Sequence, residues 1–194
     1  MASTAPSRLA SDPRLVATRL DLARVTRRGL GMTVAASLYW FGMAAVTAWA
    51  GLEPEPLALF FMLATLLVYP LGWALNCGFG GKLFARDHGF GGLMVAMTLS
   101  QFLAWPLLVA IFLLRIELIA FALAVVLGAH FLPYGWLYRS PSYFALGLAT
   151  VLVATLLQWA WPWRSNLLIP LGMGACYALA AAGVRRENRR ADGC

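Results

Sequence analysis

Six apolar runs, each roughly twenty residues long, constrain this chain more than any other feature of its sequence. They cover residues 33–52, 56–75, 93–114, 118–138, 143–161 and 167–184. A helix needs about twenty apolar residues to cross a hydrocarbon core roughly 30 Å thick. Because lipid offers no partner to a free backbone N–H or C=O group, each spanning run must be helical. The sequence therefore predicts an all-α fold, a polytopic transmembrane helix bundle with six spans.

The composition excludes an ordinary soluble domain. Hydrophobic residues make up 61% of the chain and charged residues 12%, whereas soluble domains are about half apolar and about a quarter charged. The net charge of +7 is compatible with nucleic-acid binding, but the basic residues lie at the ends of the spans and form no single patch. We therefore expect the lipid bilayer as partner, and no nucleic acid.

The placement of arginine and lysine predicts the orientation of the spans, because basic residues favour the cytoplasmic side. One set of span ends carries most of them: Arg8, Arg14, Arg19, Arg24, Arg27, Arg28, Lys82, Arg86, Arg139, Arg185, Arg186, Arg189 and Arg190. The other set carries only Arg115 and Arg164. Both termini are therefore predicted to be cytoplasmic.

The chain divides into three predicted parts. Residues 1–30 form a cytoplasmic, arginine-rich N-terminal segment, residues 31–184 the six-helix transmembrane domain, and residues 185–194 a basic cytoplasmic tail. Residues 1–12 are rich in Ser, Ala and Pro and are predicted to be disordered. Pro13 then suits the first turn of a helix. The residues that follow fit either an interfacial helix on anionic headgroups or a solvated helix.

The connector at residues 76–92 contains six glycines, which predicts a flexible, hinge-like link. Its glycines match no phosphate-binding pattern. A shift of 63 residues places the stretch Pro70 to Trp73 on Pro133 to Trp136, both of the form P-x-G-W. Two interpretations of this match stay open: duplication of spans one and two as spans three and four, or coincidence in a biased alphabet.

His130 is the only His, Asp, Glu, Lys or Arg inside the predicted spans. Ionisable groups in a bilayer are costly and rare, so such a residue is a functional hypothesis by default. Tyr134 lies four residues on, on the same helix face. Pro133 has no N–H and frees a carbonyl near residue 129, so with Gly135 it predicts a helix break. Together with Gln101 and Tyr69 of neighbouring spans, His130 and Tyr134 form the candidate polar centre.

Two interpretations of His130 remain open. In the functional one, the polar centre binds a proton, an ion or a polar headgroup through the imidazole. In the structural one, neutral His130 donates a hydrogen bond across helices to a carbonyl or to Gln101, Ser100 or Tyr69. The observation that separates them is whether His130 lines a cavity or packs against carbonyls.

Aromatic residues near the span ends predict belts at headgroup depth. The predicted belts comprise Trp159, Trp161 and Trp163 on the outer side and Trp73, Trp136, Tyr138 and Tyr143 on the inner side. The sixth span carries small residues at four-residue intervals: Gly172, Cys176 and Ala180, and also Gly174, Ala178 and Ala182. Such faces allow close helix packing inside the monomer or in a homo-oligomer.

No motif predicts a metal, a cofactor or a catalytic group. The two histidines occur without a CxxC or HExxH pattern. No serine lies in a G-x-S-x-G context, and no span contains paired carboxylates. Asp87 and His88 are expected to be a solvated pair in a loop. An enzymatic role is thus the least favoured class.

The stretch at residues 128–138, GAHFLPYGWLY, resembles one in a family of small bacterial membrane proteins known only as a domain of unknown function. The matching residues are Gly128, Ala129, His130, Phe131, Pro133, Tyr134, Trp136 and Tyr138. The resemblance extends from the first span to the sixth, with the arginine-rich N-terminal segment outside it. It implies a multi-pass protein of the bacterial inner (plasma) membrane and supplies no activity.

Three functions remain as hypotheses. The first is a small transporter or channel-like protein with a polar centre at His130. The second is a non-catalytic structural or partner-binding membrane protein. The third is a lipid-modifying membrane enzyme with His130 or the pair Asp87 and His88 as base.

Overall fold

The computed structural model describes residues 12–83, 85 and 87–193, and this part of the chain is almost entirely helical. The elements are α2 (Pro13–Val25), η1 (Arg27–Gly29), α3 (Leu30–Trp49), α4 (Pro54–Gly78), α5 (Gly91–Phe102), α6 (Trp105–Leu114), η2 (Ile116–Leu118), α7 (Ile119–Ala129), α8 (Phe131–Leu137), α9 (Pro141–Ala160), η3 (Pro162–Arg164) and α10 (Ser165–Asp192). The predicted disorder concerns residues 1–12, of which residues 1–11 lie outside the described residues.

Six helical stretches are long and apolar enough to cross a membrane. They are Arg27–Trp49, Pro54–Gly78, Gly91–Leu114, Ile116–Leu137, Pro141–Ala160 and Pro162–Asp192. Each overlaps one of the six predicted runs. The predicted all-α class and the number of candidate spans are therefore confirmed.

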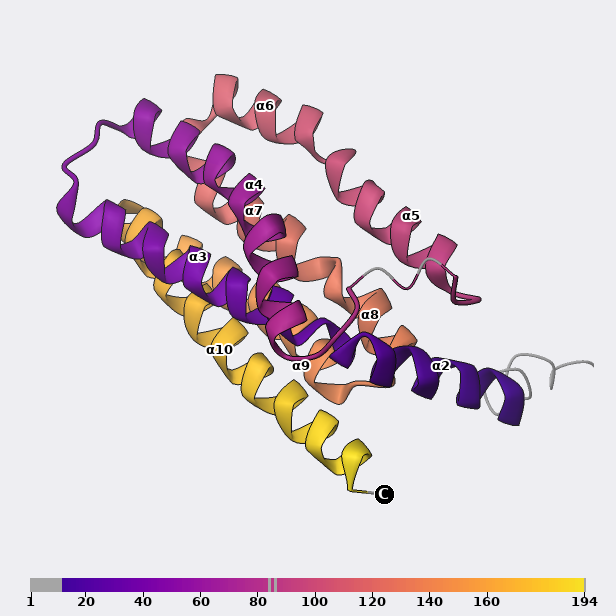
Figure 1. Cartoon of the computed structure of the whole chain (residues 1–194). Helices are drawn as coiled ribbons and strands as arrows, with labels where there is room; N and C mark the ends of the chain where they lie inside the picture. The colour runs from indigo at the N-terminus through magenta and orange to yellow at the C-terminus, as the bar shows by residue number, and fades with distance from the viewer. Residues whose placement is uncertain (1–11, 84, 86, 194) are drawn as a thin grey trace, which may run out of the picture.

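Helices α3 and α10 form the centre of the bundle. Helix α3 packs along both α4 and α10, and α9 and α7 complete the group (Figure 1). Glycines bring these helices together: a side chain on Gly31 would meet the backbone of Asn76, and one on Gly174 would meet the ring of Phe41. Small residues let helix backbones approach closely in a membrane protein, where apolar side chains gain little by leaving lipid.

The third candidate span is packed differently from the others. It consists of α5 and α6, which we call the α5–α6 arm, and it stands away from the central helices (Figure 1). In the arm, only Gly91, Met94 and Leu108 are buried. The break between α5 and α6 has a local cause, because the ring of Pro106 would clash with the carbonyl of Phe102 in a continuous helix.

Helix α2 begins at Pro13, as predicted, with the Asp12 side chain accepting a hydrogen bond of 2.9 Å from the Arg14 N–H. It packs against protein, because Leu22 and Ala23 are completely buried. The helix is therefore a packed part of the bundle, and neither the interfacial nor the solvated alternative describes its inner face.

A buried arginine attaches α2 to the end of α8. The Arg19 guanidinium lies 4.1 Å from the ring centroid of Trp136 and donates to the carbonyl oxygens of Trp136 and Leu137. A positive charge at the C-terminal end of a helix is favourable, because the last carbonyls have no partner within the helix. Burial lowers the pKa of Arg19 from its ordinary value, and nearby Arg139 lowers it further.

The turn between α2 and α3 contains successive residues in the left-handed region, with φ of 51° at Arg27, 50° at Arg28 and 63° at Gly29. This conformation costs roughly 1–2 kcal/mol for each non-glycine residue. We call residues 26–29 the elbow. The elbow sets the change of direction between α2 and α3, and contacts from elsewhere in the protein must offset the cost of its conformation.

Side chains from three other helices hold the elbow by its carbonyl oxygens. The Asn76 amide donates to Thr26 (3.2 Å), the Asn188 amide to Arg27 (2.9 Å) and the Tyr143 hydroxyl to Arg28. The connector after α4 adds a backbone bond of 2.9 Å from Lys82 N–H to Val25 O. The elbow is thus the point where α4, α9 and α10 meet the α2–α3 turn.

The two P-x-G-W stretches make different packing contacts. Gly72 lies against Met32 of the preceding helix α3, whereas Gly135 lies against Phe144 of the following helix α9. A repeated hairpin would place Gly135 against the arm. The packing is therefore not repeated between the two hairpins, and duplication at the level of the sequence stays a hypothesis.

Candidate functional site

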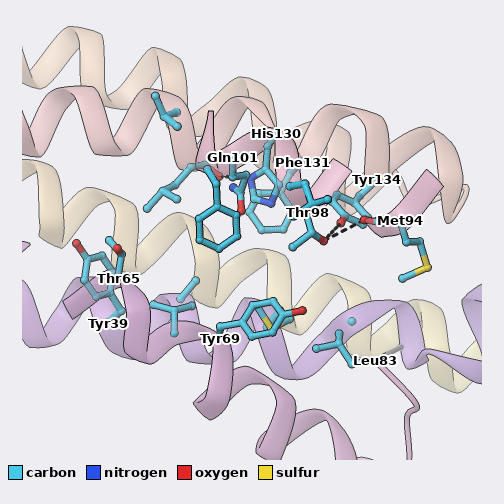
Figure 2. A pocket seen from close by; sticks show the side chains of 18 of the residues that line it. Tyr39, Thr65, Tyr69, Leu83, Met94, Thr98, Gln101, His130, Phe131 and Tyr134 are labelled. Atoms are coloured by element: carbon cyan, nitrogen blue, oxygen red, sulfur yellow. Dashed lines mark hydrogen bonds between the residues drawn. The ribbon is translucent and has the colours of Figure 1, made fainter. Parts of the chain in front are cut away.

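A cavity of about 690 Å³ lies between the arm and the central helices (Figure 2). Along the elbow and α3 its wall runs from Gly29 to Trp40, which corresponds to about 16 Å at the helical rise. The arm closes the opposite side with Met94, Thr98 and other residues of α5 and α6. The cavity therefore exists because the arm is not packed onto α3 and α4.

All four residues of the candidate polar centre line this cavity: Tyr69 on α4, Gln101 on α5, His130 at the junction of α7 and α8, and Tyr134 on α8. In the view of Figure 2, Gln101 and His130 lie on one wall and Tyr69 on the facing wall. The structure thus brings together residues that lie on three different spans.

The helix break predicted at Pro133 and Gly135 lies earlier in the chain. Helix α7 ends at Ala129 and α8 begins at Phe131, so the interruption is at His130. Pro133 is in the first turn of α8, where its missing N–H is not needed. In a continuous helix its ring would clash with the carbonyl of Ala129, four residues earlier. Gly135 is inside α8. The proline therefore places His130 itself at the discontinuity.

His130 bonds a carbonyl and lines the cavity at the same time. Its Nδ1 lies 2.7 Å from the carbonyl oxygen of Leu127, which also accepts a bond of 2.9 Å from the Tyr177 hydroxyl. Because a carbonyl carries no proton, Nδ1 must donate, and in the neutral ring Nε2 then carries a lone pair. The bond is to the residue three positions earlier, not across helices as the structural interpretation predicted. Among the described residues, no hydrogen bond joins His130 to Gln101, Ser100 or Tyr69.

Tyr134 connects the arm to α8. Its hydroxyl oxygen lies 3.3 Å from Oγ1 of Thr98, and Thr98 donates its own proton to the Met94 carbonyl at 3.0 Å. The Thr98 hydroxyl has one proton, so Tyr134 is the donor in the bond between the two helices. The ring of Tyr134 also meets the His130 ring edge-on, with 5.7 Å between centroids.

Gln101 presents an unsatisfied donor. Its Nε2 is buried and has no hydrogen-bond partner in the described part of the chain. A buried donor left without a partner costs about 1–3 kcal/mol. Of the four candidate residues, Gln101 is therefore the one whose side chain most clearly needs a further group.

Aromatic rings form much of the cavity wall. They belong to Tyr39, Trp40, Tyr69, Phe102, Trp105, Phe131, Tyr134, Tyr138, Tyr143 and Tyr177. Of the described residues that line the cavity, none is Asp, Glu, Lys or Arg. No group of three or more His, Cys, Asp or Glu side chains suited to a metal ion occurs among the residues that were placed.

Two tyrosines that we assigned to an aromatic belt are in fact core residues. Tyr138 and Tyr143 are each 2% exposed. The Tyr143 ring stacks on Phe131 with 5.3 Å between centroids. A signal for Tyr138 was present in the sequence, because His130, Tyr134 and Tyr138 follow one another at four-residue intervals on one helix face. The tryptophans of both belts are exposed, and their position at headgroup depth stays a prediction.

A second polar cluster, missed in the sequence, lies beside the elbow. Arg28 donates to the Asn188 side-chain oxygen at 2.6 Å, and its Nε lies 3.6 Å from Oε2 of Glu187. The other oxygen of Glu187 accepts bonds from the Ser142 N–H (3.1 Å) and hydroxyl (2.6 Å) at the start of α9. Glu187 and Asn188 belong to the predicted cytoplasmic tail, yet they help to hold the elbow, α9 and α10 together.

The loop pair proposed as an alternative base is not a pair in the structure. Nε2 of His88 lies 3.4 Å from a carboxylate oxygen of Asp21 on α2, and Nδ1 accepts from the Phe90 N–H. Asp87 is exposed. His88 thus links the connector to α2 and is not among the residues that line the cavity.

The small residues of the sixth span are largely used inside the monomer. A side chain on Gly172 would meet Val153 and Leu157 of α9, and Gly174 faces Phe41 of α3. Ala178, Leu179 and Ala182 point outward, and Leu179 is 75% exposed. Of the small-residue pattern on α10, this outward face is the part that is free to meet another copy.

The comparisons place the chain in a family without a known activity. A family model described as a family of unknown function (DUF7010) matches residues 15–187. The match includes most of α2, which we had expected to lie outside the resemblance; the packing of Arg19 and Leu22 on the bundle explains why α2 is part of the common unit. No curated protein and no solved structure was found to match the chain. Because the family model covers most of the sequence, this chain belongs to the family of unknown function DUF7010.

Proposed function

We propose that this protein is a small membrane transporter that binds a lipophilic molecule in the cavity between the arm and the central helices. The observation that carries the proposal is the cavity itself, whose volume of about 690 Å³ lies within the range of about 300–1,000 Å³ of small-molecule sites. Such sites combine apolar walls with a few polar groups that orient the ligand. Here His130, Gln101 and Tyr134 supply those groups.

The arm is the proposed entrance. It has few buried residues, and the hydrogen bond between Thr98 and Tyr134 is a side-chain contact that a small movement would break. Segments with few buried contacts open at low free-energy cost. A molecule dissolved in the bilayer would enter when the arm moves away from α4 and α8.

We further propose a location in the inner (plasma) membrane with both termini cytoplasmic. The described ends of α2 and α10 lie at the same end of the bundle (Figure 1), which agrees with an even number of spans. In a variant without its native cysteines, a membrane-impermeant maleimide added to cells should label Glu53→Cys and not Arg186→Cys. The reverse labelling would overturn this orientation.

The binding proposal is tested by filling the cavity. Val95 and Val109 are both exposed valines of the arm, and only Val95 lines the cavity. We expect a lipophilic compound to copurify with the wild-type protein and with Val109→Trp, and to be lost from Val95→Trp. Solvent extraction and mass spectrometry measure the retained compounds. Equal retention by both variants, in the proportions of the bulk membrane, would contradict binding in the cavity.

Transport is tested with the compound that the extraction identifies. Its flux into proteoliposomes should fall in Val95→Trp and in His130→Ala, and it should be unchanged in Val109→Trp. A folded His130→Ala variant that transports at the wild-type rate would remove His130 from the mechanism.

A second role rests on the outward face of α10, where Ala178 and Ala182 flank the exposed Leu179. Small residues on a lipid-facing helix favour association with another helix, so a homo-oligomer through this face is our second proposal. Crosslinking of Ala178→Cys in membranes should produce a dimer. A variant that stays monomeric at high density in the membrane would refute it.

A further inference from the structure

We infer that the ligand of the cavity is an uncharged molecule that has a flat ring and presents an oxygen acceptor, such as a carbonyl, to the Gln101 side chain. The inference rests on the proposed binding role of the same cavity. It specifies that the ligand is uncharged, that the ligand carries an oxygen acceptor, and that Gln101 recognises this acceptor.

The charge class follows from the cavity wall. Of the described residues that line the cavity, none carries a carboxylate, ammonium or guanidinium group. An ion moved from water into such surroundings loses its hydration and gains no counter-charge, which is strongly unfavourable. An uncharged ligand avoids this cost.

The acceptor follows from the hydrogen-bond inventory of the polar centre. The proton on Nδ1 of His130 is used by the Leu127 carbonyl, the Thr98 proton by Met94, and the Tyr134 proton by Thr98. Nε2 of Gln101 is buried and lacks a partner among the placed residues. The Trp40 indole N–H, on the α3 wall, is likewise buried without a partner among the described residues. A ligand oxygen that accepts from the Gln101 amide would satisfy the unpartnered donor of the polar centre.

The ring follows from the aromatic wall. Beside the polar centre, Phe131 packs against His130, Tyr134, Tyr143 and Tyr177, with centroid separations of 4.1, 6.3, 5.3 and 5.5 Å. Stacked and edge-on aromatic pairs add to the free energy of simple burial. Aromatic walls also attract organic cations, but here the N–H of Gln101 would point its positive end at the cation. The amide therefore favours a carbonyl-bearing ring over a cation.

Matched probes separate these features. Benzophenone has two rings and a carbonyl, diphenylmethane has the same rings without the carbonyl, and tetraphenylphosphonium and tetraphenylborate are aromatic ions of opposite charge. With the full chain in lipid nanodiscs, we expect benzophenone to bind at least about five-fold more tightly than diphenylmethane, as one satisfied buried donor implies. Both ions should bind more weakly than benzophenone. Irradiation of bound benzophenone should label peptides of α5 and α8.

A pair of glutamines provides the matched variants. Gln101 and Gln158 both have a buried side-chain atom without a partner, and only Gln101 lines the cavity. Gln101→Leu should reduce the affinity for benzophenone to that for diphenylmethane and leave diphenylmethane binding unchanged. Gln158→Leu should preserve the preference for benzophenone.

The outcomes distinguish failure of the inferred ligand chemistry from failure of the proposed binding function. Equal binding of benzophenone and diphenylmethane, with labelling of α5 and α8, would overturn the acceptor role of Gln101 and leave the proposed binding function standing. Tightest binding of either ion would overturn the uncharged class in the same way. Benzophenone labelling that misses α5 and α8 would overturn both proposals.

Discussion

The first and third candidate spans are both apolar helices of similar length, yet they are packed in opposite ways. In the most apolar part of each span, 61% of the residues are buried in the first span and 6% in the third. The first span carries Gly31, Ala35 and Ser37 where neighbours approach. The arm instead exposes Leu103, Leu113 and Leu114. Small and polar residues, not apolar character, therefore decide which helices pack tightly.

The largest effect is expected at the contact between α3 and α4. A Cβ on Gly31 would collide with the backbone of Asn76, which cannot move as a flexible side chain would. Gly31→Ala should therefore lower the free energy of unfolding by about 3 kcal/mol, the upper part of the usual range for overpacking. Thermal unfolding in detergent measures the change.

Gly42→Ala is the matched control on the same helix, because nothing lies within 4 Å of its added Cβ. It should be neutral or stabilise the protein by up to about 1 kcal/mol, since alanine is a better helix former than glycine. Equal destabilisation by the two variants would contradict the tight α3–α4 contact.

The next effect concerns the side chain that joins α4 to the elbow. Asn76 accepts from the Gly31 N–H at 3.2 Å and donates to the Thr26 carbonyl at 3.2 Å, and it is completely buried. Asn76→Ala leaves both groups without this partner and should cost about 1–3 kcal/mol. Ser100→Ala on the exposed face of the arm should change stability by less than about 0.5 kcal/mol. Chemical denaturation measures the free energy of unfolding of both variants. An equal loss of stability in Ser100→Ala would contradict a special role of the Asn76 hydrogen bonds.

A smaller effect is expected where the arm meets α8. Thr98→Val removes the acceptor of the Tyr134 hydroxyl with little change of shape, and should cost about 0.5–1.5 kcal/mol. Hydrogen exchange in residues 91–102 should accelerate, while exchange in α3 stays unchanged. Thr155→Val is the control, because in the described part of the chain its hydroxyl bonds only the carbonyl of Val151 in its own helix. Unchanged exchange in the arm would show that this bond does not hold it.

The smallest effect is expected on the exposed side of the arm. Leu103 is 81% exposed in the turn between α5 and α6. Leu103→Ala should change the free energy of unfolding by less than about 0.5 kcal/mol, because few protein contacts are lost. A loss above about 2 kcal/mol, typical of a core leucine, would mean that another copy or partner covers the arm in the membrane.

Much of the candidate site was predictable because polar residues avoid lipid. Gln101, Tyr69 and His130 lie on three spans, and each was expected to face the interior for this reason. Tyr138 and Tyr143 were not recognised, since tyrosine at a span end suits a headgroup belt as well as a core. Arg28 and Asn188 were missed because basic and amide residues at a span end also suit solvent. Only their partners in the fold distinguish these environments.

The sequence by itself determined the helical class and the six candidate spans, because a bilayer requires every backbone group to be bonded within its own helix. The tertiary structure alone decided which helices pack tightly, where the elbow is held and where the cavity lies. The physical reason is that an apolar side chain gains little by exchanging lipid for protein. Both α3 and the arm are apolar enough to span a membrane, and the more apolar of the two is the less buried. The packing of a few glycines and polar side chains separates them.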